Sequence, residues 1–268
     1  MQPLLSNEYP NEPYLDCSPE ISSARQIAER ANTQGYLFFR GLIPESLLDP
    51  IRSFVRLFAV NEGWVLPENG NQAVLKGRSG AKLSGRGWDD PRWIELQRAT
   101  AQLPAFQELV SARLILDILA VVYGEKAAPA MTNHVWLKLP GSPEHTTRPH
   151  RDSFYLPGCP RMWTIWIPLS DTPIELGPLG IVAGSHRTND WPQKEAMSGI
   201  DVPKSVKWAT QAVKPGDVVF FGANTIHCAW SNMSPSDVRL SLDIRYEPLA
   251  TKNSILRPAV TKTADHGI

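Results

Sequence analysis

A strict alternation of apolar and polar residues between positions 238 and 246 constrains the fold of this chain more than any other pattern in it. Side chains two positions apart on a β-strand point the same way, so Leu240, Leu242 and Ile244 share one face. The opposite face carries the polar residues Arg239, Ser241, Asp243 and Arg245. The pattern predicts a strand with one face in an apolar core and a polar face turned away from it.

Two residues on that polar face form a pair suited to a carboxylate. Arg239 and Ser241 lie two positions apart and therefore side by side on the predicted strand. A guanidinium group binds a carboxylate through two parallel hydrogen bonds, and a neighbouring hydroxyl adds a third donor. The Arg-x-Ser pair is thus a candidate carboxylate clamp.

A second short motif is typical of metal binding. His150 and Asp152 are also two positions apart, so on a strand they would project together. They supply two of the three ligands in the two-His-one-carboxylate arrangement, which holds a non-haem ferrous ion and leaves positions open for other ligands. On its own, a His-x-Asp pair is weak evidence for a metal site.

His227 is the best candidate for the third ligand. It follows a strand-like run at residues 216–222 and lies 77 residues after His150, enough chain to travel around a barrel of antiparallel strands and return. The other histidines fit less well: His134 comes too early in the motif order, and His145 lies in a polar loop. His186 ends a Gly-Ser-His turn, where a structural role is expected, and His266 belongs to the tail.

The order of these motifs resembles the phytanoyl-CoA dioxygenase family of Fe(II)/2-oxoglutarate oxygenases. His150-x-Asp152 is followed by His227, and Arg239 comes 12 residues later. The resemblance covers about residues 35–246, and the flanking runs agree with it: 138–142, 166–171, 175–186 and 214–221. It implies a mainly β fold with flanking α-helices and a double-stranded β-helix (jelly-roll or cupin-like) core.

The resemblance also implies residue roles. His150, Asp152 and His227 would be the catalytic ligands of Fe(II), and 2-oxoglutarate would chelate the iron and leave one position for O₂. Arg239 would bind the distal carboxylate of 2-oxoglutarate, with Ser241 as a secondary donor. Two further residues, each in a run that matches the family, are expected beside this co-substrate: Lys138 and Trp166.

The implied activity is oxidation, foremost hydroxylation, of an unactivated C–H bond in a small metabolite or natural-product intermediate, with release of succinate and CO₂. Desaturation and oxidative demethylation or dealkylation begin in the same way and stay open. Related halogenases usually lack the carboxylate ligand, so Asp152 favours an oxygenase. A non-catalytic cupin-like binding protein is the alternative from another class, but it would not need the Arg-x-Ser pair. A metal-dependent isomerase or a dioxygenase without 2-oxoglutarate is a third.

Composition excludes several partners. The sequence has 268 residues with 27 basic and 27 acidic side chains, so no net charge attracts nucleic acid or an anionic membrane. No apolar run is long enough to span a bilayer, and the first residues lack the pattern of a secretory signal. Three widely spaced cysteines predict reduced thiols and a cytoplasmic protein. A monomer or homodimer is expected.

The chain is expected to form a single domain over residues 1–268, with an extended arm at 1–20 and the barrel motifs within 131–246. Helices are expected from Ser22 or Ser23 to about Thr33, over about 44–58 with Pro44 or Pro50 as its start, and over 103–123. The glycine-rich residues 63–90 are predicted to form a surface loop or a mobile lid over the site. The Trp-containing insertion at 187–209 would be the next candidate for contacting substrate.

Overall fold

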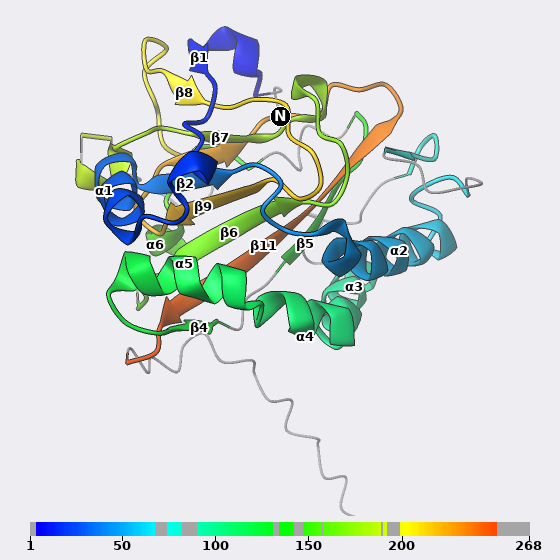
Figure 1. Ribbon diagram of the computed structural model, residues 1–268. Coiled ribbons are helices and arrows are strands. Elements are labelled where there is room, and N and C mark those ends of the chain that lie inside the picture. Colours follow the sequence, from blue (N-terminus) through cyan, green and yellow to red (C-terminus); the bar gives the residue numbers. More distant parts are fainter. Residues whose placement is uncertain are drawn as a thin grey trace, which may run out of the picture.

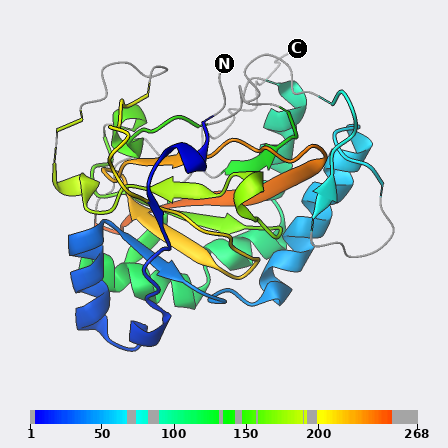
Figure 2. The ribbon, with the colours of Figure 1, turned by 90° about the horizontal axis from the view of Figure 1, so that it is seen from above.

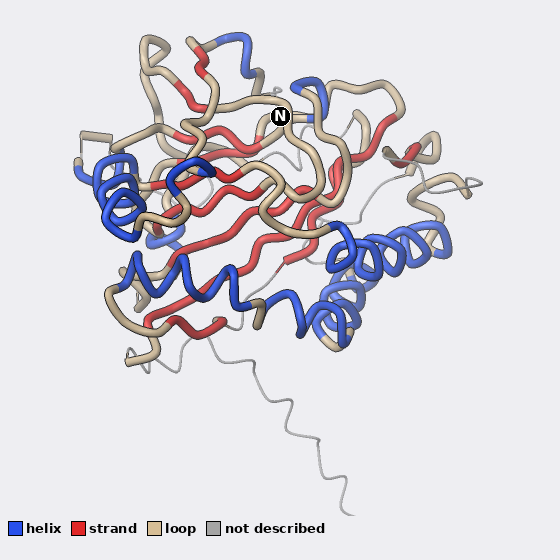
Figure 3. The backbone as a smooth tube through the Cα atoms, in the orientation of Figure 1, coloured by secondary structure: helices blue, strands red, loops and turns tan. Residues whose placement is uncertain are grey.

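Two β-sheets face each other in the computed structural model of the chain, and helices cover the outer face of the larger sheet (Figure 1). The model describes residues 4–67, 74–81, 90–130, 134–141, 147–156, 158–188, 190–191 and 199–250. Figure 3 shows the same arrangement by secondary structure, with the helices in blue flanking the strands in red. The predicted fold, a double-stranded β-helix with flanking helices, is confirmed.

The larger sheet has seven strands in the order β2-β9-β6-β11-β3, with β4 and β5 also pairing with β11. Its central member, β11, is the strand that the alternating pattern predicted, and it is longer than predicted. The strands are β2 (Tyr36–Phe39), β3 (Leu75–Lys76), β4 (Ala127–Pro129), β5 (His134–Lys138), β6 (Trp163–Pro168), β9 (Val218–Gly222) and β11 (Asp237–Pro248).

The smaller sheet has four strands in the order β1-β8-β7-β10. Its members are β1 (Asn11–Glu12), β7 (Leu179–Ile181), β8 (Trp208–Ala209) and β10 (His227–Ala229). It lies over the inner face of the larger sheet, because Leu179 and Ile181 pack in one buried cluster with Trp166, Val219 and Phe221 of the larger sheet.

The helices are α1 (Ala24–Gln34), α2 (Glu45–Asn61), α3 (Pro91–Ala101), α4 (Pro104–Val110), α5 (Arg113–Tyr123) and α6 (Asp152–Tyr155). Helix α1 confirms its predicted ends: the Ser23 hydroxyl accepts a hydrogen bond from the amide of Gln26, and Gly35 closes the helix in the left-handed region at φ 74°. Helix α2 begins at Glu45 and keeps Pro50 within it, so a start at Pro50 was wrong. Helix α3 was not predicted.

The expected long helix over 103–123 is two helices. Ala112 has an extended backbone (φ −59°, ψ 125°), which ends α4 and starts α5 at Arg113. The Ser111 hydroxyl donates to the Gln107 carbonyl at 2.6 Å, a local bond that competes with the helical ladder. The apolar periodicity continues across the break because both helices bury their apolar faces in the same core cluster. Periodicity alone therefore predicted one continuous helix.

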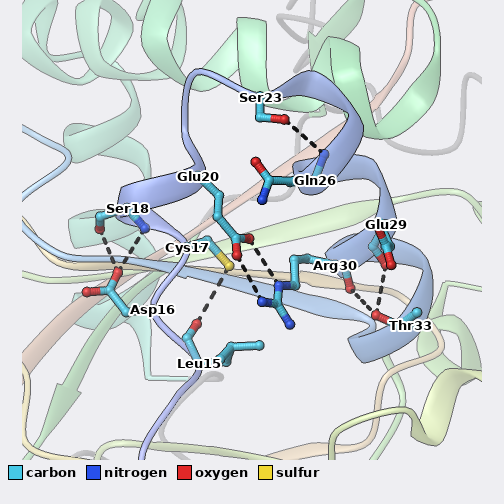
Figure 4. Close-up of polar contacts among 10 residues, drawn as sticks. All are labelled: Leu15, Asp16, Cys17, Ser18, Glu20, Ser23, Gln26, Glu29, Arg30 and Thr33. Atoms are coloured by element: carbon cyan, nitrogen blue, oxygen red, sulfur yellow. Dashed lines mark hydrogen bonds and ion pairs between the residues drawn. The ribbon is translucent and has the colours of Figure 1, made fainter.

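The N-terminal arm contains two short 3-10 turns, Ser6–Glu8 and Ser18–Glu20, and is tied down along its length. In Figure 2 the arm, in dark blue, crosses the strands, and β1 pairs with β8 in parallel. Figure 4 shows the polar contacts that lead from the arm into α1: the Asp16 carboxylate accepts from Ser18, and Arg30 donates twice to Glu20. Tyr14 is buried between the two sheets.

Residues 63–90 are only partly described. Leu75 and Lys76 form β3 and pair with the start of β11, so the stretch contains a strand and is not wholly a loop. Residues 68–73 and 82–89, on which much of the lid prediction falls, lie outside the described residues. In the part of the chain that is described, no helix is long and apolar enough to cross a membrane. Cys17, Cys159 and Cys228 are buried free thiols.

Candidate metal and co-substrate site

His150, Asp152 and His227 meet between the two sheets. Their ligand atoms all lie within 4.8 Å of one another, and all three side chains are buried. The Oδ1 atom of Asp152 lies 3.5 Å from Nε2 of His150 and 3.6 Å from Nε2 of His227. Atoms bound to one ion at about 2.1 Å can be at most about 4.2 Å apart, so both of these separations fit ligands of a single divalent ion.

Backbone pairing brings the two histidines together. The amides and carbonyls of His150 and His227 exchange two hydrogen bonds, at 3.0 and 3.1 Å, in an isolated antiparallel bridge. Asp152 is not on a strand as expected: it is the first residue of α6. Arg151 before it remains extended (φ −114°, ψ 133°), so His150 and Asp152 still point the same way.

The tautomer of both histidines is set by local carbonyl groups. Nδ1 of His150 lies 2.8 Å from the Arg148 carbonyl, and Nδ1 of His227 lies 2.9 Å from the Thr225 carbonyl. A carbonyl only accepts, so each Nδ1 carries the proton and each Nε2 presents its lone pair toward Asp152. Burial lowers the pKa of His227 to about 3, which keeps its imidazole neutral as a metal ligand must be.

Asp152 is ionised. Burial opposes its ionisation, but the Arg245 guanidinium outweighs burial and holds its pKa well below the usual range. Its Oδ2 atom accepts a hydrogen bond from the Thr164 hydroxyl at 2.7 Å and lies 3.5 Å from Nε of Arg245. A neutral His pair and one carboxylate are the donor set that non-haem Fe(II) takes.

A cavity of about 430 Å³, counting its open mouth, joins these residues to Arg239. Arg239 is 2% exposed, and its Nη1 donates to the Gly177 carbonyl at 2.6 Å. Burial lowers its pKa to about 10, so it stays charged at neutral pH. Among the described residues no carboxylate lies within ion-pair distance of it, and its Nε has no partner.

The Ser241 hydroxyl is the second polar group without a partner on this face. It is fully buried, and no described residue hydrogen-bonds to it. A buried polar group left unpaired costs about 1–3 kcal/mol, as does the unpaired Nε of Arg239. Two such donors side by side on β11 match the distal carboxylate of 2-oxoglutarate, which would satisfy both.

The other two predicted co-substrate residues lie differently. Trp166 lines the cavity, and the Arg239 guanidinium sits 5.8 Å from its ring centroid. Lys138 is buried, but its ammonium donates to the carbonyls of Ala229 and Trp230 at 2.9 and 2.6 Å and does not line the cavity. Lys138 therefore lies outside the cavity, and its two hydrogen bonds hold the end of β10 against β5.

Several residues at the site were not predicted as such, and Trp136, Asp243 and Thr164 are among them. Trp136 and Asp243 line the cavity, with the indole Nε1 of Trp136 donating to Oδ2 of Asp243 at 2.6 Å. Thr164 contacts Asp152. The alternation did place Asp243 on the face of Arg239, and the same reading of β6 places Thr164 on the face of Trp166. The sequence therefore predicted which face of its strand each of these residues lies on, but not which residues it contacts.

The competing candidates lie elsewhere. His134 stacks on Trp93, and burial lowers its pKa to about 3; the ring of His186 contacts the Asn32 carbonyl. Trp208 of the 187–209 insertion is a fully buried core residue that does not line the cavity. No described part of residues 63–90 lines the cavity. His145, His266, residue 189 and residues 192–198 lie outside the described residues.

Comparison with known proteins agrees with this geometry. The family model of phytanoyl-CoA dioxygenase matches residues 31–240. The 1-deoxypentalenic acid 11-beta-hydroxylase of Streptomyces arenae is 22% identical over 275 residues, which cover 95% of this chain and 93% of that protein.

Solved structures share the fold. The non-heme alpha ketoglutarate dependent epimerase SnoN from nogalamycin biosynthesis superposes with a TM-score of 0.61 at 19% identity, over 89% of this chain and 91% of SnoN. The carbocyclase SnoK, from the same biosynthesis, gives 0.58 at 22% identity, over 89% and 88%. A second SnoN structure, at 0.62 and 19% over 91% and 93%, holds Fe³⁺, alpha ketoglutarate and nogalamycin RO.

Proposed function

Because this chain belongs to the phytanoyl-CoA dioxygenase family and is an Fe(II)/2-oxoglutarate-dependent oxygenase, we propose that it hydroxylates an unactivated C–H bond of a small metabolite or natural-product intermediate. Its cofactor is Fe(II), and its co-substrates are 2-oxoglutarate and O₂. In this proposal His150, Asp152 and His227 hold the iron.

One observation carries the assignment of residues. A single cavity has at one end three metal-binding groups within 4.8 Å of one another and at the other a buried arginine without a carboxylate partner among the described residues. A cupin-like binding protein has no use for a buried guanidinium without a counter-charge, which destabilises the fold until an anion binds. Arg239 and Ser241 would hold the distal carboxylate of 2-oxoglutarate.

Each residue then has a definable task. The Arg148 and Thr225 carbonyls keep the protons of His150 and His227 on Nδ1, so both Nε2 atoms are available to the metal. The guanidinium of Arg239 orients the co-substrate. Bound iron and 2-oxoglutarate supply the oxidising chemistry, with succinate and CO₂ as the co-products. Trp166, Phe221 and Leu179 form an apolar wall that limits access of water.

The cavity also supports a small substrate with apolar surface. Aromatic and aliphatic side chains line one wall, and the polar groups other than Thr147 and the three metal-binding residues lie on β11, as in sites for small molecules. The name of the Streptomyces arenae relative describes hydroxylation of a small natural product. The apolar wall and that relative support the same class of substrate here.

The test is reconstitution of the protein with Fe(II), 2-oxoglutarate and O₂, followed by addition of pools of small metabolites. We expect succinate formation that needs all three components and rises with certain pools. The mass of the product identifies the reaction: hydroxylation adds one oxygen atom, desaturation removes two hydrogens, and dealkylation shortens the substrate.

His227→Ala is the matched negative control, and we expect it to lose succinate formation together with metal binding. Succinate formation that is unchanged in His227→Ala would contradict the residue assignment. Substrate-stimulated turnover that yields a product without added oxygen would contradict hydroxylation and leave the residue assignment intact.

A further inference from the structure

The two carboxylate oxygens of Asp152 have different surroundings. Oδ1 faces both imidazoles, at 3.5 and 3.6 Å from their Nε2 atoms. Oδ2 faces the opposite way, toward the hydroxyl of Thr164 at 2.7 Å and Nε of Arg245 at 3.5 Å. The Asp152 side chain is buried, at 4% exposure.

The two groups at Oδ2 come from neighbouring strands at the same register. Thr164 on β6 pairs directly with Arg245 on β11, so their side chains stand side by side on the inner face of the larger sheet. Asp152 reaches them from α6, on a separate segment of the chain. The sheet therefore fixes the donors, and the carboxylate rotates to meet them.

We propose that Thr164 and Arg245 are positioning residues: they reserve Oδ2 of Asp152, so that Oδ1 alone binds the metal. This inference rests on the proposed role of Asp152 as a ligand. Both donors stabilise the charged carboxylate through hydrogen-bonding or ionic contact, and a hydroxyl donating to a carboxylate forms a short, strong bond. Groups that orient a metal ligand change metal affinity about 10–100-fold when removed.

The arrangement has a consequence for the reaction. A carboxylate that binds through both oxygens occupies two positions on an ion, whereas one held by Thr164 and Arg245 occupies one. Three protein atoms then leave three positions of a six-coordinate ion for a chelating co-substrate and O₂. Thr164 and Arg245 would thus keep a position open without touching the metal or the substrate.

The experiment uses the metal-free protein titrated with Co(II), whose visible absorption reports its coordination. Thr164→Val keeps the shape of the side chain and removes the hydroxyl, and we expect Co(II) to bind about 10–100-fold more weakly with an altered spectrum. Thr164→Ser restores the hydroxyl and should restore both affinity and spectrum. Arg245→Lys, which keeps the charge but moves the donor, should give an intermediate loss.

Thr172→Val is the matched control, because Thr172 is a fully buried threonine whose hydroxyl donates to the Ser170 carbonyl, away from the cavity. It should bind Co(II) as the unmodified protein does. The proposal is overturned if Thr164→Val keeps the original affinity or spectrum, if Thr164→Ser fails to rescue, or if Thr172→Val shows the same loss. Asp152→Ala distinguishes the ligand assignment from the positioning role. If Asp152→Ala keeps the original Co(II) affinity, the assignment of Asp152 as a ligand fails as well. If Asp152→Ala loses affinity while the Thr164 and Arg245 variants do not, only the positioning role fails.

Discussion

Both faces of β11 are largely buried but differ in how their side chains are used. Val238, Leu240, Leu242, Ile244 and Tyr246 point outward into the core beneath the helices, and all are fully buried. The inward residues Arg239, Ser241, Asp243 and Arg245 are also largely buried, yet two of their polar atoms, Nε of Arg239 and Oγ of Ser241, have no partner among the described residues.

This comparison teaches that burial does not distinguish the stabilising face of this strand from the functional one. The two faces differ instead in whether their buried polar atoms have hydrogen-bond partners. The outward face gains free energy from apolar contact, whereas the inward face gives up stability to keep donors available. Substitutions on the two faces should therefore have opposite consequences: loss of stability on one, and loss of ligand binding without loss of stability on the other.

The largest expected effect is on the inward face. Arg239→Ala should weaken 2-oxoglutarate binding by about 2–5 kcal/mol, or about 30-fold to several thousand-fold, because it removes the cation from a desolvated ion pair. The dependence of succinate formation on 2-oxoglutarate concentration measures this. The melting temperature of the free protein should change little, because removal of the uncompensated charge and of the unpaired Nε offsets the lost hydrogen bond to the Gly177 carbonyl. Turnover at the original co-substrate level would place the clamp elsewhere.

An outward substitution of similar size should act on stability alone. Leu242→Ala should lower the free energy of unfolding by about 2–5 kcal/mol, because it opens a cavity in the core. Denaturant titration measures the loss, with Leu57→Ala as the control: Leu57 is 61% exposed and its truncation should cost less than about 0.5 kcal/mol. If folded Leu242→Ala instead required more 2-oxoglutarate, the two faces would not be separable.

Ser241→Ala should have a smaller effect, and only when co-substrate binds. Loss of one hydrogen bond to a carboxylate costs about 1 kcal/mol, or about a fivefold increase in the 2-oxoglutarate required. Thermal unfolding without ligand should occur at the original temperature or slightly above it. A clear loss of stability would show that the hydroxyl has a partner in the free protein.

Asp243→Asn should give the smallest change, in the opposite direction. Asp243 lies four residues from Arg239 on the same face, about 13 Å along the strand, and lines the same cavity, so its charge opposes that of bound 2-oxoglutarate. We expect Asp243→Asn to raise the affinity for 2-oxoglutarate only about threefold. Burial raises the pKa of Asp243, so this carboxyl carries less negative charge and repels 2-oxoglutarate less to begin with. Asp237→Asn, at the start of the same strand and outside the cavity, should change nothing.

Stability against pH gives an independent check on Asp243. Its pKa in the fold is raised, so the folded protein holds a proton that the unfolded chain releases. The unmodified protein should therefore lose stability as the pH rises from the ordinary aspartate pKa through the raised one, and Asp243→Asn should lack that loss. Parallel melting curves for the two proteins across this range would contradict the shift.

Much of the site was predictable from short motifs. The order His150, Asp152, His227 and Arg239 predicted a metal centre and a carboxylate clamp, and the structure brings all four to one cavity. Lys138 shows the limit of such reasoning: it aligns with a family run, but whether its ammonium meets a ligand or the Ala229 carbonyl depends on how β5 and β10 pack. No local pattern encodes that distance.

The sequence by itself determined the features that depend on a few neighbouring residues. The two faces of β11 follow from strand geometry, and the ends of α1 follow from Ser23 and Gly35. Only the tertiary structure decided the features that require distant segments to meet. Examples are the approach of Asp152 to Thr164 and Arg245, and the pairing of β3 with β11. The physical reason is that local propensity acts over one or two turns of chain, whereas the partners of a buried charge are chosen by how the sheets and helices close around it.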